Sequence, residues 1–168
     1  MILLRLLNRL IHSFMQYQFK RSQLVNTDLK TLWDFASSPT NLSKITPDYM
    51  NFKIKSSLPD KGMYPGMMII YTVCPLLKLP MTWITEITSV ENESYFVDEQ
   101  RVGPYKMWHH EHHFEQKENG VLMTDIVTYI PPLGVLGELA NILFIKKQLN
   151  TIFEYRFKAM DKLFPKIA

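Results

Sequence analysis

The residues best suited to chemistry lie in one short segment, residues 108–114, which reads WHHEHHF. On a β-strand alternate side chains share a face, so His110 and His112 would point the same way as Trp108 and Phe114. Imidazole groups bind metals and transfer protons near neutral pH. The segment therefore predicts a sheet surface on which two histidines lie among aromatic side chains.

A second strand places an acidic group beside these histidines. Asn119-Gly120 is a strong hairpin signal, and residues 121–130 alternate like a strand. A two-residue turn at 118–119 pairs His112 with Asp125 and Trp108 with Tyr129, whereas a slip of one residue would move these pairs to opposite faces. The expected wall carries one Trp, two His, one Asp and one Tyr.

Three interpretations of this wall are open. A His-x-His pair with Asp125 or Glu111 could bind a metal, but no third nitrogen or sulfur ligand shares the face, so we expect no metal centre and no cofactor. As catalytic residues, His112 and Asp125 could transfer a proton in a cyclisation or dehydration. We favour the third interpretation, in which these groups satisfy each other or orient a polar group of a ligand inside an apolar pocket.

Charge and cysteine content exclude several classes of function. Four cations, Arg5, Arg9, Lys20 and Arg21, precede the first acid, and the remainder has 15 basic and 16 acidic side chains. Nucleic-acid binding needs a basic face, so none is expected. The single Cys74 excludes an internal disulfide and predicts a reducing, cytoplasmic location. No phosphate-binding glycine loop or nucleophile elbow appears in the sequence.

The elements that must position the wall are mostly strands. Hydrophobic alternation and turn residues predict seven of them, at residues 17–26, 52–58, 67–74, 81–90, 95–102, 105–116 and 121–130. Two short helices, over 28–36 and 40–45, follow the first strand, with Asn26 or Thr27 as the cap of the first.

A long helix over residues 138–164 ends the chain. Its apolar residues recur every three or four positions, and we expect the following to be buried: Leu139, Ile142, Ile145, Leu149, Ile152, Phe153, Met160 and Leu163. Such a helix is about 40 Å long, so a broad partner must cover it. The sequence therefore predicts an α+β helix-grip fold, in which a curved antiparallel sheet wraps the helix and leaves an internal cavity.

The first residues form a separate unit. Residues 1–15 are predicted as a basic amphipathic helix and residues 16–168 as the helix-grip domain. The unbroken apolar run is too short to span a membrane. Peripheral membrane contact through residues 1–14, docking on this domain or a second copy, and an extension of a chain that starts at Met15 are the three alternatives.

Several short motifs resemble one known superfamily. They are LSKITP (42–47), VDEQ (97–100), GPY (103–105), W-x-H-x-H-x-F (108–114), MTD (123–125) and F-x-YR (153–156). With the order of elements over residues 17–164, they resemble the SRPBCC superfamily of START, Bet v 1-like and polyketide cyclase/dehydrase-like proteins. The resemblance implies a hydrophobic cavity between the sheet and the last helix, and it carries no catalytic set onto this chain.

We therefore expect the protein to bind a small apolar molecule such as a lipid, polyketide or isoprenoid. Ligand contacts are expected from these residues: Tyr71, Trp83, Trp108, His110, His112, Asp125 and Tyr129. One alternative is a cyclase or dehydratase that uses His112 with Asp125. Another is an interaction protein that docks a membrane or partner through its N-terminal helix.

Overall fold

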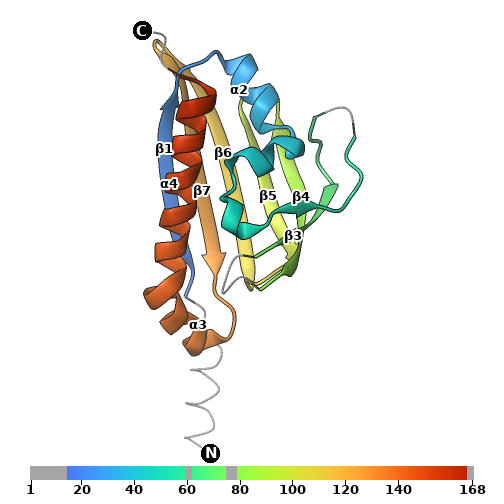
Figure 1. Ribbon diagram of the computed structural model, residues 1–168, viewed down its shortest axis with the longest axis vertical. Coiled ribbons are helices and arrows are strands. Elements are labelled where there is room, and N and C mark those ends of the chain that lie inside the picture. The colour runs from blue at the N-terminus through green and yellow to red at the C-terminus, as the bar shows by residue number, and fades with distance from the viewer. Residues whose placement is uncertain (1–14, 60–61, 75–78, 166–168) are drawn as a thin grey trace, which may run out of the picture.

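The computed structural model describes residues 15–59, 62–74 and 79–165 (Figure 1). The predicted N-terminal helix lies outside these described residues. No helix within the described ranges has the length and the apolar character that crossing a bilayer requires.

One antiparallel sheet of seven strands carries the fold, as predicted. Its spatial order is β1-β7-β6-β5-β4-β3-β2, so each strand from β2 to β7 pairs with the next in sequence, and β1 closes onto β7. The strands are β1 (Tyr17–Val25), β2 (Lys53–Ile54), β3 (Met67–Val73), β4 (Met81–Glu91), β5 (Tyr95–Val102), β6 (Met107–Lys117) and β7 (Gly120–Ile130).

Short helices after β1 cross one end of the sheet (Figure 1). They are α2 (Leu29–Ala36), the 3-10 turn η1 (Pro39–Ile45) and a second 3-10 turn, η2 (Asp48–Met50), which the sequence did not predict. The predicted cap of α2 was wrong: Asp28 is the N-cap, and its Oδ1 accepts a hydrogen bond from the Thr31 backbone N–H at 2.8 Å. A carboxylate at this position also favours the positive end of the helix.

The second predicted strand is shorter than expected. Only Lys53–Ile54 pair with β3, because the N–H groups of Lys55 and Ser56 both donate to the Ile70 carbonyl and interrupt the regular ladder. Leu58 still turns inward, as the alternation predicted, and packs on a cluster of β3 and β4 side chains.

The C-terminal helix begins earlier than predicted and is not regular. It comprises α3 (Gly134–Ala140), a π-helical segment (Asn141–Ile145) and α4 (Lys146–Leu163). Leu149, Phe153 and Met160 are buried as expected. The prediction was wrong at Leu139 and Ile142, which are 55% and 67% exposed, and at Leu163, which is 42% exposed.

The π segment explains the exposed leucine and isoleucine near the start of this helix. An i→i+5 turn adds a residue to the helical repeat, so the residues before it are out of phase with the buried stripe of Leu149, Phe153 and Met160. Asn141 is therefore the residue buried against the sheet, where its side-chain oxygen accepts a 2.8 Å hydrogen bond from the Tyr129 hydroxyl.

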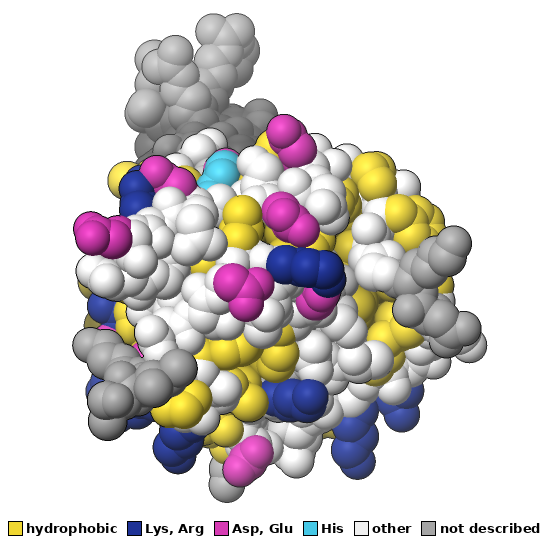
Figure 2. All heavy atoms as spheres, turned by 90° about the horizontal axis from the view of Figure 1, so that it is seen from above, with side chains coloured by type: hydrophobic (Ala, Val, Ile, Leu, Met, Phe, Trp, Pro, Cys, Tyr) yellow, Lys and Arg dark blue, Asp and Glu magenta, His cyan; other side chains and the backbone are white. Residues whose placement is uncertain are grey.

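Two apolar clusters anchor the helices on the sheet. At one end Trp33 of α2 meets Phe96 and Phe114 edge-on, with ring centroids 6.1 and 5.5 Å away. Further along, Phe153 of α4 packs on Phe19 of β1. The α2 end seen from above carries interspersed acidic and basic side chains around apolar atoms (Figure 2), so this face is not a basic surface.

Candidate functional site

A cavity of about 190 Å³ lies between the sheet, η1 and α4. The β-strands contribute aromatic side chains to its wall, η1 contributes Leu42 and Ile45, and α4 contributes Ile152 and Phe153. Alternation on β4 explains part of this wall, because Trp83, Thr85 and Ile87 all face inward. The cavity is thus closed by segments that are distant in the sequence.

The two histidines of β6 face this cavity between two carboxylates. Strand pairing places Asp98 of β5 opposite His110, and Asp125 of β7 opposite His112, which confirms the predicted hairpin register. His110 Nδ1 lies 3.4 Å and His112 Nε2 lies 2.9 Å from Asp98 Oδ2. On the other side, His110 Nε2 and His112 Nδ1 lie 3.1 and 2.9 Å from Asp125 Oδ1.

This arrangement engages all four ring nitrogens. The two imidazole rings lie against each other with centroids 3.8 Å apart. A neutral imidazole has one N–H donor and an imidazolium has two. Two of the four contacts are hydrogen bonds, His110 Nε2 with Asp125 and His112 Nε2 with Asp98, and one N–H on each ring is enough to supply them.

Electrostatics favour the charged forms of His110, Asp98 and Asp125. Burial alone would lower the pKa of His110, but Asp98 and Asp125 outweigh it and raise that pKa above its ordinary value. For Asp125, burial would raise the pKa, yet Arg156 and the two histidines hold it well below its usual range. The pKa of Asp98 is also lowered, because both histidines outweigh its burial.

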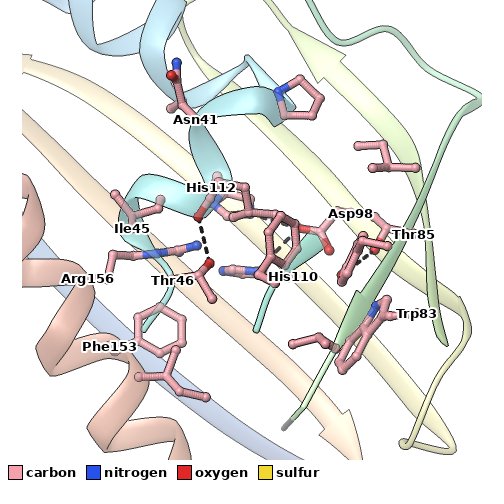
Figure 3. Close-up of a pocket in the computed structure, with 18 of the residues that line it drawn as sticks. Asn41, Ile45, Thr46, Trp83, Thr85, Asp98, His110, His112, Phe153 and Arg156 are labelled. Carbon is pink, nitrogen blue, oxygen red and sulfur yellow. Dashed lines mark hydrogen bonds and ion pairs between the residues drawn. The ribbon is translucent and has the colours of Figure 1, made fainter. Parts of the chain in front are cut away.

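Arg156 of α4 adds a cation that the sequence did not predict. Its Nη1 lies 3.1 Å from Asp125 Oδ1, and its guanidinium lies 5.1 Å from the centre of the Phe153 ring. The side chain lines the cavity and points from α4 toward Thr46 and the histidines (Figure 3). Its Nε is buried and has no hydrogen-bond partner among the residues that the structure describes.

Asp98 adds a carboxylate oxygen beside the two histidines, although the third nitrogen or sulfur ligand that the sequence lacked is not supplied by it. One ligand atom each from Asp98, His110 and His112 lies within 4.8 Å of the others, a spacing that could hold a metal ion. The same atoms contact one another at hydrogen-bond distances, so a proton can satisfy the group in place of an ion.

The structure gathers most of the predicted ligand contacts. Five of them line the cavity, namely Tyr71, Trp83, Trp108, His110 and His112. Asp125 and Tyr129 are each 1% exposed and lie outside the lining, Asp125 beneath the histidines and Tyr129 against Asn141.

Sequence reasoning missed Asp98 and Arg156, although signals for both existed. Extending the register from β6 to β5 would have placed Asp98 opposite His110. On a helix, Arg156 follows Phe153 by three residues and precedes Met160 by four, so it lies on the face that meets the sheet.

Comparisons with known proteins inform the fold alone. No protein-family model and no curated protein matches the sequence. Among solved structures, protein Ms6760 from Mycobacterium smegmatis has a TM-score of 0.64 at 12% identity, over 90% of this chain and 95% of the other.

Two further structures carry more descriptive names. The major latex-like protein 151 of Panax ginseng has a TM-score of 0.60 at 10% identity, over 90% of this chain and 99% of the other. The di-domain ARO/CYC protein BexL has a TM-score of 0.64 at 13% identity, over 91% of this chain and 51% of the other. The chain therefore has the Bet v 1-like helix-grip fold of the superfamily that its motifs resemble.

Proposed function

We propose that this protein binds a small, largely apolar molecule in the cavity between its sheet and α4. The supporting observation is a cavity whose wall is mainly aromatic and aliphatic, with one polar cluster at its floor. Pockets that bind small molecules have this composition, in which a few polar groups fix the orientation of the ligand. The ligand's apolar part contacts Tyr71, Trp83 and Trp108.

The aromatic side chains of the wall contact one another. Trp83 stacks on Tyr71 at 6.1 Å between ring centroids and meets Trp108 edge-on at 5.5 Å. Rigid rings offer a large apolar area at little cost in side-chain entropy, which favours binding of a flexible partner. These three residues are the apolar binding surface of the proposal.

Native mass spectrometry of gently purified protein, followed by displacement of a fluorescent lipid probe, tests this function. A co-purifying ligand and saturable probe binding are expected. Trp83→Leu should weaken probe binding about tenfold, whereas Trp33→Leu, a matched loss outside the cavity, should leave it within about twofold. A protein that binds no probe and carries no ligand would refute the proposal.

A second candidate is an enzyme of the cyclase or dehydratase type. Its supporting observation is that His112 lies between two carboxylates, hydrogen-bonded through Nε2 to Asp98 and with Nδ1 2.9 Å from Asp125 Oδ1, a setting in which a carboxylate can orient an imidazole base. Because Asp98 occupies the other nitrogen at 2.9 Å, a substrate must displace it before a proton can move.

Kinetics separate this candidate from simple binding. For an enzyme, His112→Ala should abolish turnover of a polyketide-like substrate while leaving its affinity nearly unchanged. Parallel losses of affinity and turnover would count against the catalytic role of His112.

A further inference from the structure

We infer that the bound molecule is a single-chain carboxylic acid whose carboxylate pairs with Arg156. This inference rests on the proposed binding function and adds the chemical class of the ligand. Three observations carry it: the unused donors of Arg156, the charges around it, and the size and polarity of the remaining cavity.

Arg156 has more hydrogen-bond donors than its described neighbours use. A guanidinium offers five N–H groups, and the one hydrogen bond found for Arg156 runs from Nη1 to Asp125. Nε is buried without a partner, and the side chain is only 12% exposed. Buried unpaired donors are costly, so a ligand acceptor at this point contributes more than it would at a solvated surface.

The geometry of a guanidinium suits a carboxylate in particular. Its planar fork donates two parallel hydrogen bonds to the two oxygens of one acid group. Figure 3 shows the Arg156 side chain reaching from α4 into the cavity toward Thr46 and His110, so a ligand in the cavity would lie beside its guanidinium.

The two carboxylates of the cluster do not occupy this edge. Asp125 is 1% exposed, lies beneath the histidines, and receives contacts from both imidazoles as well as Arg156 on a single oxygen. Asp98 lines the cavity, but both histidines contact its Oδ2 and offset its charge. An incoming anion therefore meets Arg156 with Asp98 paired and with Asp125 paired through Oδ1, while Asp125 Oδ2 is buried without a hydrogen-bond partner among the described residues.

The rest of the cavity fits one apolar chain. Apart from the cluster, the wall around the cavity is mainly apolar, and it includes Ile45, Met50, Phe52 and Ile152. The volume of about 190 Å³ is below the roughly 300–1,000 Å³ of pockets for drug-sized molecules. This space holds one apolar chain, and a second chain of a lipid would have to lie in the open mouth of the pocket.

Calorimetric titration of the full chain with decanoate and with decanol tests the inference. The two probes share an apolar chain and differ in the charged group. Decanoate should bind the native protein at least about tenfold more tightly than decanol, because only the acid forms charge-assisted hydrogen bonds with Arg156. Equal affinities, or tighter binding of decanol, would overturn the inference and leave the binding function standing.

Substitutions in α4 test whether Arg156 causes the preference for decanoate over decanol. Arg156→Gln should reduce the preference for decanoate to within about twofold while decanol binds as before, which also shows that the variant is folded. Lys158→Gln removes the same charge from an exposed position two residues away and should retain the full preference. A preference that survives in Arg156→Gln refutes the role of Arg156. If the native protein binds neither probe and displaces no fluorescent lipid, the proposed function fails as well.

Discussion

The polar cluster is unusual at the scale of single residues because two buried imidazoles share two carboxylates. His110 and His112 each contact Asp98 and Asp125, so loss of one acid affects both rings. Removing one partner of a buried ion pair leaves the other charge desolvated and unpaired, which is more costly than removing a surface pair.

Asp98→Asn should therefore lower the free energy of unfolding by about 3 kcal/mol. Glu99→Gln is the matched control, because Glu99 is the next residue on β5 and pairs with Arg101 and His109 at the outer face. That change should cost less than about 1 kcal/mol. Urea denaturation measures both, and equal effects would show that the cluster contributes nothing beyond a surface pair.

The same cluster predicts how stability varies with pH. The pKa of His110 is raised above 6.5 in the folded protein, so its contribution is complete below pH 6.5 and is lost as pH rises through the raised value. The pKa of Asp125 is lowered from 3.8, so its contribution is present above that value and is lost as the solution becomes more acidic.

Urea denaturation over a pH series should thus give greatest stability between these two limits. His110→Gln removes the titrating imidazole, so the decline on the alkaline side should become shallower while the decline in acid persists. An alkaline decline of unchanged size in the variant would show that another group causes it.

At the scale of elements, the β6–β7 hairpin sets the register that brings His112 opposite Asp125. Its turn depends on Gly120, whose φ is +134° and where a Cβ atom would lie 2.3 Å from the Val25 carbonyl oxygen. Gly66 also has a positive φ, +88°, but a Cβ atom there would meet nothing within 4 Å. Substitutions at Gly66 and Gly120 therefore separate the stability cost of backbone strain from that of steric overlap.

Gly66→Ala should cost roughly 1 kcal/mol or somewhat more through backbone strain alone. Gly120→Ala should cost about 2 kcal/mol beyond that, because β1 must also move away from the hairpin. Thermal and urea unfolding of the two variants measure the difference, and equal losses would mean that contact with Val25 is unimportant.

At the scale of the whole molecule, the cavity exists because a curved sheet and an irregular helix meet without filling the space between them. The helix contributes apolar side chains at Leu149, Ile152 and Phe153 and one cation at Arg156. Its first turns present exposed apolar residues instead, among them Leu143 and Phe144 at 54% and 59% exposed. The part of the helix that lines the cavity is therefore different from the part that exposes apolar side chains.

The predicted basic amphipathic segment is tested by deleting residues 1–14. If that segment binds anionic lipid, the full chain should sediment with anionic liposomes and the shortened chain should remain in the supernatant. The shortened chain should still bind the fluorescent lipid probe, because the cavity is built from later residues. Unchanged sedimentation would end the membrane interpretation.

The sequence by itself determined the sheet, the hairpin register and the position of the last helix. The patterns that predicted them are local: period-two alternation, the Asn119-Gly120 turn, and the helical spacing of Leu149 and Phe153. Local patterns can be recognised in a sequence without a structure. They were sufficient to place His112 opposite Asp125.

Tertiary structure alone decided how the site is completed. Asp98 faces His110 across the β5–β6 pairing, and Arg156 reaches Asp125 from α4, so the sequence placed each residue on a suitable face but not at these contacts. The π segment likewise shifts the helix so that Asn141 is buried against Tyr129, a phase change that the spacing of apolar residues does not record. Cavity size depends on how closely the sheet and α4 approach each other, and that distance is set by all of their packed side chains together.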